Sequence, residues 1–449
     1  MVVLRYDENR KTGQLSITNP RLDKLEKVIT EVKRHFIPIK NDLVKVPASL
    51  SYPDYNFMWN RDSAYGSYYI TIFTETAKRS GLENLLSNDI NELEKLNGKL
   101  IYTLWKYLDQ EVEKINKKGY ESDIRKLEST LGSNHILARF DIDENGIKRA
   151  ERDKNEENTF RSWIMQYDWS FIIEATREYL QEYESIVPAE TLKLIEKSLN
   201  FLVKYMYNFY VTPSADAWEH YYIYEDKSYD NKHIRIGKTI DSYTVSSLYK
   251  GIKSAKAIAR MLGIKIEEVN EEDVSKFLLN NFTIEHETMG KFLAKSKIEL
   301  GETIPSIGAE EIEIFNTFRP TGVENLEENT VRIIEKELFD GNPLPIRYKF
   351  FDKYKDIVDT YFGRGSWFNL GLQYSMYLNK NGRREESEKI INYVESKIAD
   401  DGSIPEQEIY DKNRVYDPDH YFERNGNSTI KDLLWAKTAY LAAVAIDLI

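Results

Sequence analysis

Apolar residues recur at intervals of three and four along most of the chain, the spacing that places side chains on one face of an α-helix. The clearest stripe is formed by Val245, Leu248, Tyr249, Ile252, Ala255 and Ala259. Comparable stripes predict helices over residues 21–35, 63–80, 90–117, 169–184, 188–206, 329–339, 366–378, 384–398 and 433–448. Strand-like alternation is scarce, and residues 281–298 are the least clear. Because roughly ten to twelve helices are predicted without a long series of strands, we expect an all-α fold.

The chain is predicted to form one domain over residues 1–449, with residues 1–20 as a short N-terminal extension. No stretch rich in Pro, Gly or Ser divides it. Two segments are expected to be irregular: the strongly polar residues 141–158, predicted as a long loop, and residues 282–322. Lys437 and Asp447 interrupt the most apolar stretch, which we therefore predict to be a buried helix and not a membrane span.

Composition narrows the chemistry that is open to the chain. It contains no cysteine, which excludes disulfides, thiolate metal sites and cysteine nucleophiles. Its six histidines form no H-x-x-x-H pair and no EF-hand ladder of carboxylates occurs, so we do not expect a catalytic metal ion held by protein ligands. The formal charge of −12 disfavours nucleic acid and anionic membranes as partners, and it favours neutral or cationic substrates. The first residues lack the apolar core of a signal peptide, so we expect a cytoplasmic protein; no oligomeric state is predicted.

Four short segments combine carboxylates with aromatic or glycine residues, and each precedes a predicted helix. They read YPDYNFMWNRD at residues 52–62, DAWEH at 216–220, DTYFGRGSW at 359–367 and DGSIPEQ at 401–407. Each one alone is explained as well by ordinary structure, such as an N-cap aspartate, a surface arginine or a solvated turn. Their combination is what indicates a function.

Taken together, these residue types suit the recognition and cleavage of a sugar. Arg61 and Asp62 offer a donor fork and an acceptor, which match neighbouring hydroxyls. Glu219 follows the indole of Trp218, and partial desolvation there would raise its pKa as a general acid requires. Two carboxylic acids that flank a sugar bond are the minimum apparatus of glycoside hydrolysis. Aromatic faces pack on sugar rings, and helix N-termini supply N–H donors for hydroxyl oxygens.

At these residues the chain resembles the glucoamylase-type glycoside hydrolases, family 15, whose catalytic domain is an (α/α)6 barrel. Residues 53–62 resemble the family's Pro-Asp-Tyr-x-Tyr-x-Trp-x-Arg-Asp, residues 216–219 its Asp-Leu-Trp-Glu, and residues 404–407 its hydrophobic-x-Glu-Gln. Residues 359–367 and 429–435 parallel two further family motifs, and residues 166–168 match a third more loosely. The matches run in family order from about residue 46 to residue 443, which is nearly the whole chain.

The resemblance implies an exo-acting, inverting α-glucosidase that releases β-glucose from the non-reducing ends of α-linked oligosaccharides or polysaccharides without a cofactor. It makes Glu219 the general acid and Glu406 the general base. The other implied site residues are hydroxyl ligands, pocket walls and subsite groups, namely Trp59, Arg61, Asp62, Asp216, Trp218, His220, Arg347, Asp359, Tyr361, Trp367 and Trp435. His220 stands where the family usually has a second glutamate. The residues before residue 21 are too few for the β-sandwich that precedes the barrel in prokaryotic relatives.

Three alternatives stay open at this point. A trehalase or an α-1,6-glucosidase is possible, because the family includes both. A non-catalytic sugar-binding regulatory protein is the alternative of another class, since phosphorylase kinase uses the fold in that way, although the retention of both Glu219 and Glu406 argues against it. An all-α terpenoid cyclase has little support, because the chain lacks the Asp-Asp-x-x-Asp motif of those enzymes.

Overall fold

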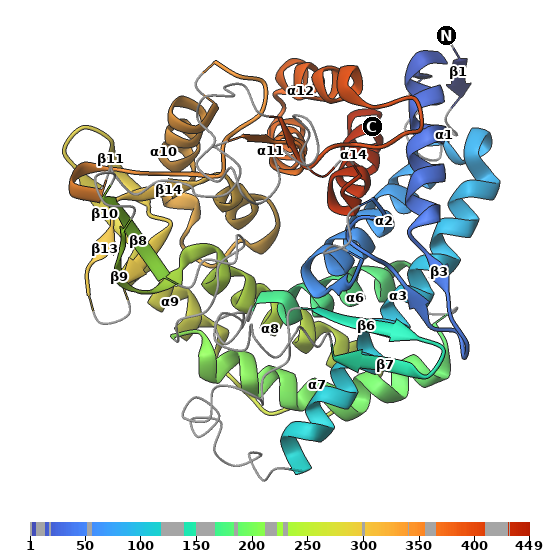
Figure 1. Cartoon of the computed structure of the whole chain (residues 1–449), viewed down its shortest axis with the longest axis horizontal. Coiled ribbons are helices and arrows are strands. Elements are labelled where there is room, and N and C mark those ends of the chain that lie inside the picture. The colour runs from blue at the N-terminus through green and yellow to red at the C-terminus, as the bar shows by residue number, and fades with distance from the viewer. Residues whose placement is uncertain are drawn as a thin grey trace.

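The computed structural model describes residues 2–5, 14–17, 19–51, 56–117, 139–149, 167–183, 187–211, 222–227, 232–298, 301–339, 341–354, 365–408, 430 and 432–449. Helices dominate these residues, and they are arranged around a ring (Figure 1). The order along the chain alternates between a helix that lines the inside of the ring and a helix that covers it from outside.

The inner ring is built from helices that are buried on almost every side. In the order α2, α6, α8, η5, α11 and α14, each packs on the next, and α14 closes the ring on α2. Their bounds are α2 Asn60–Ser80, α6 Tyr167–Tyr183, α8 Ser242–Leu262, the π-helical turn η5 Ile314–Phe318, α11 Phe368–Lys380 and α14 Leu434–Asp447. Every residue of α14 from Leu434 to Ala445 is buried, which confirms the predicted burial of the C-terminal helix.

The outer helices cover this ring. They are α1 Asn19–Arg34, α3 Glu83–Lys117, α7 Ala189–Phe209, α9 Glu271–Phe282, α10 Glu324–Ile334 and α12 Arg384–Lys397. α3 packs on α2 and α7, α9 packs on α8, and α12 packs on α11 and α14. α1 and α14, which lie far apart in the sequence, are side by side. Inner and outer helices alternate as in the predicted (α/α)6 barrel, and the all-α fold class is confirmed.

Short strands connect and precede the helices. The paired strands are β1 Val2–Arg5 with β2 Gln14–Ile17, β3 Ile37–Pro38 with β4 Val44–Lys45, β10 Thr283–His286 with β11 Gly290–Leu293, β14 Ser306–Gly308 with β15 Tyr348–Phe350, and β16 Ser366–Trp367 with β17 Gln407–Glu408. Two larger sheets contain β5 Met58–Trp59, β6 Arg139–Asp143 and β7 Gly146–Arg149, and β8 Tyr222–Lys227, β9 Lys232–Asp241, β12 Ser296–Ile298 and β13 Thr303–Ile304. All described pairings are antiparallel.

Two parts of the structure differ from the sequence prediction. Residues 139–149 form the hairpin of β6 and β7, where the polar pattern predicted part of a long loop. The segment 282–322, expected to be irregular, contains the fourth inner element, η5, which the turn η4 Ala309–Glu311 precedes. The prediction failed there because Glu310, Glu311 and Glu313 are buried and break the apolar stripe that marks a helix. Helix α9 was also not predicted.

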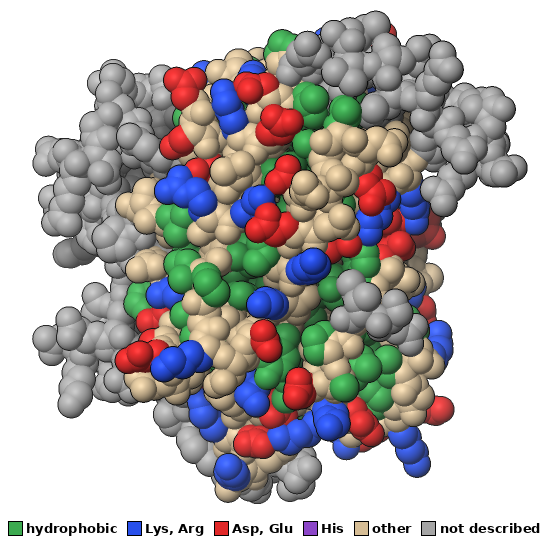
Figure 2. All heavy atoms as spheres, turned by 90° about the vertical axis from the view of Figure 1, so that its right-hand side faces the viewer, with side chains coloured by type: hydrophobic (Ala, Val, Ile, Leu, Met, Phe, Trp, Pro, Cys, Tyr) green, Lys and Arg blue, Asp and Glu red, His purple; other side chains and the backbone are tan. Residues whose placement is uncertain are grey.

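The outer surface carries charges of both signs. Figure 2 shows Lys and Arg interspersed with Asp and Glu on one face, with small apolar areas between them. Some pairs join neighbouring outer helices; Lys197 Nζ of α7 lies 2.9 Å from Asp109 Oδ2 of α3. Pairs that are exposed to solvent contribute about 0–1 kcal/mol each, so packing of the ring and not surface charge holds the fold. Of the helices in the described part of the chain, none is long and apolar enough to cross a membrane.

Two inner helices approach each other so closely that one position admits only glycine. Gly251 of α8 faces Ser170 of α6, and the hydroxyls of Ser170 and Ser247 form a hydrogen bond across the same contact. A Cβ at residue 251 would lie 2.4 Å from the Ser170 Cβ and 2.7 Å from the Ser170 Cα. A backbone atom is part of this contact, so a side-chain rotation does not relieve it.

We therefore expect Gly251→Ala to lower the free energy of unfolding by about 1–3 kcal/mol, the usual cost of overpacking. This sign is opposite to the gain of about 1 kcal/mol that alanine brings to an ordinary helix interior. The control is Gly66→Ala on α2, where the added Cβ would meet only the side chain of Leu434, at 3.2 Å. Urea denaturation of both variants measures the difference; equal stability of the two would contradict the close contact.

Candidate functional site

The predicted site residues that the structure describes lie around the N-terminal ends of the inner helices. Trp59 is the N-cap residue of α2, and Trp367 is the N-cap residue of α11. Trp435 is in the first turn of α14, whose N-cap residue is Leu433. The N-cap side chains of these three helices form no capping hydrogen bond.

The start of α2 brings a buried ion pair against an indole. Arg61 Nη2 lies 3.3 Å from Asp62 Oδ2, and the Arg61 guanidinium carbon is 5.4 Å from the centroid of the Trp435 ring. Asp62 is only 1% exposed, and burial raises the pKa of its carboxyl. The positive charge of Arg61 opposes this effect but does not cancel it. Because Asp62 also lies in the first turn of a helix, the helix dipole favours its charged form. Arg61, Asp62 and Trp435 thus lie together at this helix start.

Aromatic rings of the inner helices pack against this group. The Tyr65 ring stacks on Trp435 with centroids 4.2 Å apart and packs on Phe171 at 3.9 Å. The hydroxyl of Tyr65 forms a hydrogen bond with that of Tyr243, which links α2 to α8. Burial raises the pKa of both phenols, so both hydroxyls stay protonated and can donate. Trp59, a further predicted wall residue, is 4% exposed at the same helix start.

A second group lies around the start of α11. Arg347 is 2% exposed, and its guanidinium carbon lies 5.2 Å from the Trp367 ring centroid and 5.5 Å from that of Tyr348. Glu406 is 3% exposed, and its backbone carbonyl accepts a hydrogen bond of 3.2 Å from Phe368 N, the first residue of α11. The strand pair of β16 and β17 joins Trp367 to Gln407. The predicted base, Glu406, thus lies at the start of α11, beside Trp367 and the Arg347 that packs on its ring.

Sequence reasoning missed a cluster of buried charges that adjoins Arg347. Lys295 Nζ lies 2.6 Å from Glu310 Oε1 and 3.2 Å from Asp241 Oδ1, and Lys295 is 1% exposed. Ala309 N donates to Arg347 O at 2.7 Å, which places this cluster next to the second group. Burial and the neighbouring Glu310 raise the pKa of the Glu311 carboxyl well above its usual range. The one signal in the sequence was a set of acidic residues inside an otherwise apolar stretch.

Several predicted site residues lie outside the described residues. They are Asp216, Trp218, Glu219, His220, Asp359 and Tyr361. Their roles remain predictions, and so does the separation between the carboxyl groups of Glu219 and Glu406. The described residues include no group of three or more His, Cys, Asp or Glu side chains that could hold a metal ion.

A cavity of about 440 Å³ opens at the other end of the ring. Its lining includes Tyr68 of α2, Lys380 at the end of α11 and Ile446 near the end of α14. None of the predicted site residues that the structure describes lines it. The cavity is therefore separate from the two groups at the helix starts, which contain Arg61, Trp435, Arg347 and Glu406.

The Arg61–Asp62 pair makes a prediction about stability. Arg61→Leu would leave the Asp62 carboxylate buried without its cation, which costs about 3–5 kcal/mol at about pH 7. A carboxyl whose pKa is raised in the folded state is already protonated there at low pH, so the loss should shrink as the pH falls toward about 4. Urea denaturation at the two pH values measures this. The double variant Arg61→Leu/Asp62→Asn should recover much of the loss at neutral pH; a loss that is the same at both pH values would show that Asp62 is not the cause.

Comparison with known proteins defines the fold further. No protein-family model and no curated protein sequence matches the chain. Solved structures do: a glycosidase variant in complex with glucose aligns over 97% of this chain and 100% of its own, with a TM-score of 0.67 and 13% identity. A glucoamylase from Saccharomycopsis fibuligera covers 99% and 98%, with a TM-score of 0.59 and 14% identity. A glycoside hydrolase family 15 glucoamylase from Hypocrea jecorina covers 95% and 71%, with a TM-score of 0.50 and 14% identity. The resemblance that the motifs predict is confirmed at the level of the fold: the chain has the helical fold of these glycosidases and glucoamylases.

Proposed function

We propose that the protein is an exo-acting, inverting α-glucosidase, which releases β-glucose from the non-reducing ends of α-linked glucans or oligosaccharides. The observation that carries the proposal is the position of Glu406 beside Arg347 and Trp367, on the end of the ring where Arg61, Asp62 and Trp435 also meet. A carboxylate, two guanidinium groups and several indole faces are the groups that a sugar pocket needs. The glycosidase and glucoamylase relatives in fold support the same reaction class.

In the proposed mechanism the two arginines and Asp62 bind hydroxyls of the terminal sugar, while Trp59, Trp367 and Trp435 pack on its faces. Glu219 protonates the oxygen of the bond that breaks. Glu406 takes a proton from a water molecule, which attacks the anomeric carbon from the opposite face. No cofactor takes part. The buried position of Glu406, at 3% exposure, limits the water around the base and strengthens its interaction with the attacking molecule.

The remaining predicted residues complete the proposed site. Trp218 and Tyr361 line it on the side of the bond that breaks, Asp216 and Asp359 are subsite carboxylates, and His220 donates one hydrogen bond to a sugar hydroxyl as a neutral imidazole. We further propose that the barrel forms a single catalytic domain.

The carboxylate pair is tested by substitution. Glu219→Gln and Glu406→Gln should each lower kcat about 10²–10⁴-fold, the usual contribution of general acid–base catalysis, while folding and sugar binding persist. The matched control is Glu408→Gln, two residues beyond the base, where the carboxylate is bound by Lys397 Nζ at 2.6 Å and by the Tyr393 hydroxyl. Glucose release from maltose, isomaltose, trehalose and maltoheptaose identifies the linkage. Sugar binding without turnover in the wild-type protein would indicate a sensor instead of an enzyme.

The stereochemistry of the product tests the role of Glu406 separately. An inverting enzyme places a water molecule between the base and the anomeric carbon, so its two carboxyl groups lie about 6.5–9.5 Å apart and an α-linked substrate gives β-glucose first. Proton NMR of the anomeric region during early turnover observes the product before mutarotation. Initial α-glucose would mean retention, and Glu406 would then be a nucleophile or have no part in the reaction.

A further inference from the structure

The chain just before α14 makes backbone hydrogen bonds to two distant segments. Glu406 N donates to Ile430 O at 2.8 Å, and Leu433 N donates to Ile404 O at 3.2 Å, so the loop that carries the proposed base is held on this segment. Leu434 N donates to Ala48 O at 2.9 Å. Residues 46–51 lead into the segment 52–62, which carries Trp59, Arg61 and Asp62. The chain before α14 is therefore the shared support of both halves of the candidate site.

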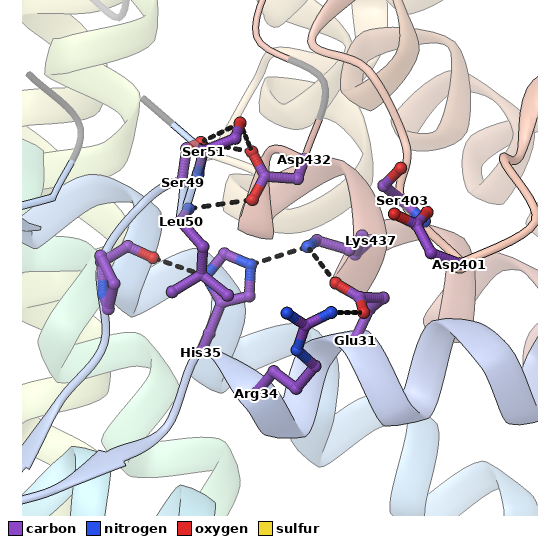
Figure 3. A network of polar contacts seen from close by, with 11 residues as sticks. Glu31, Arg34, His35, Ser49, Leu50, Ser51, Asp401, Ser403, Asp432 and Lys437 are labelled. Carbon is purple, nitrogen blue, oxygen red and sulfur yellow. Dashed lines mark hydrogen bonds and ion pairs between the residues drawn. The ribbon is translucent and has the colours of Figure 1, made fainter. Parts of the chain in front are cut away.

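The side chain of Asp432 strengthens the contact with residues 46–51 (Figure 3). Its Oδ2 accepts a hydrogen bond of 2.9 Å from Leu50 N, and its Oδ1 accepts one of 2.5 Å from the Ser51 hydroxyl and one from the Ser49 hydroxyl. One carboxylate, 6% exposed, thus binds three consecutive residues. A buried carboxylate with several donors is a strong and directional anchor, because hydrogen bonds to a charged acceptor are about twice as strong as neutral ones.

A second buried chain of contacts lies one helical turn further on. Lys437, which is fully buried in the first turns of α14, places its Nζ 2.7 Å from His35 Nε2. His35 Nδ1 lies 2.7 Å from Pro47 O, an atom that only accepts, so the proton of the neutral ring is on Nδ1 and Lys437 donates to Nε2. Figure 3 shows the side chains of Lys437 and His35 between α14 and the segment that carries Ser49, Leu50 and Ser51. Glu31 of α1 completes the group, with Oε2 at 4.0 Å from Lys437 Nζ.

Charged side chains from three segments act on Lys437. Asp432 precedes it on its own segment, Glu31 and Arg34 lie on α1, and Asp401 is on the loop of the proposed base. Burial lowers the pKa of Lys437 to about 8, while the three carboxylates raise it. Burial and the charge of Lys437 hold the pKa of His35 well below its usual value. At neutral pH Lys437 thus carries a positive charge and the imidazole of His35 is neutral.

We infer that Asp432 and Lys437 are positioning residues, which hold the loop of Glu406 in register with the segment of Trp59, Arg61 and Asp62. The inference rests on the proposed function for its catalytic consequence, but not for its structural part. Neither residue is among the groups proposed above to bind the sugar. Asp432 fixes residues 49–51 and Lys437 fixes Pro47 through His35, while the backbone around residues 430–434 holds the base loop. Loss of either side chain lets the two halves of the site move relative to each other.

The test uses the full-length protein and the variants Asp432→Asn and Lys437→Met. The asparagine keeps the shape of the side chain, but its amide nitrogen cannot accept the hydrogen bonds that one carboxylate oxygen accepts. The methionine keeps the length and the apolar part of the lysine and removes the donor. The control is Asp109→Asn, a buried carboxylate on the outer helix α3 that binds Ser198 Oγ at 3.0 Å and Lys197. Ser51→Ala, which removes a single donor, is the milder variant if Asp432→Asn does not fold.

Two measurements, hydrogen exchange and kcat, test the positioning role separately from the proposed function. Hydrogen exchange of peptides that cover residues 401–408 and 432–437 should become at least about tenfold faster in both variants and stay unchanged in Asp109→Asn. The kcat for glucose release should fall about 10²-fold, as for a small misplacement of catalytic groups, with KM changed less than about threefold. If the wild-type protein releases no glucose, the proposed function fails, and exchange alone decides the positioning role. Unchanged exchange, or a loss of kcat that matches the control, overturns the inference.

Discussion

The ring of inner helices is buried on both sides, and the rest of the molecule depends on that constraint. A helix that is covered by outer helices on one side and by other inner helices on the other offers only its two ends to a ligand. The polar groups along its length must find partners inside, as Thr176 of α6 does when its hydroxyl accepts a hydrogen bond of 2.8 Å from the indole N–H of Trp105 on the outer helix α3. The residues that can perform chemistry are therefore concentrated at the helix starts, where Arg61 and Trp435 meet.

Much of this arrangement could be predicted from the sequence. The amphipathic stripes gave most helices within a few residues, and the motif of residues 52–62 placed Trp59, Arg61 and Asp62 at a helix start, where the structure has them. The fourth inner element, η5, could not be predicted in the same way. Its π-helical turn has no regular spacing of three and four, and Glu313 is fully buried there with a pKa that burial raises to about 7.

The candidate site was predicted in part for a related reason. A sequence motif identifies functional residues only where they lie close together along the chain. The cluster of Lys295, Asp241 and Glu310 joins residues up to 69 positions apart, and no local pattern marks it. The same is true of Lys437, which looks like a surface interruption of an apolar stretch and is fully buried against His35.

The hydrogen bond between Ser49 and Asp432 joins residues that are 383 positions apart. During synthesis at about 5–20 residues per second, the chain that ends in α14 leaves the ribosome roughly 20–80 s after the segment it must close upon. For that whole interval the apolar face of α2 that α14 later covers has no native partner. A ring in which α14 closes on α2 therefore completes its packing only after α14 has been synthesised.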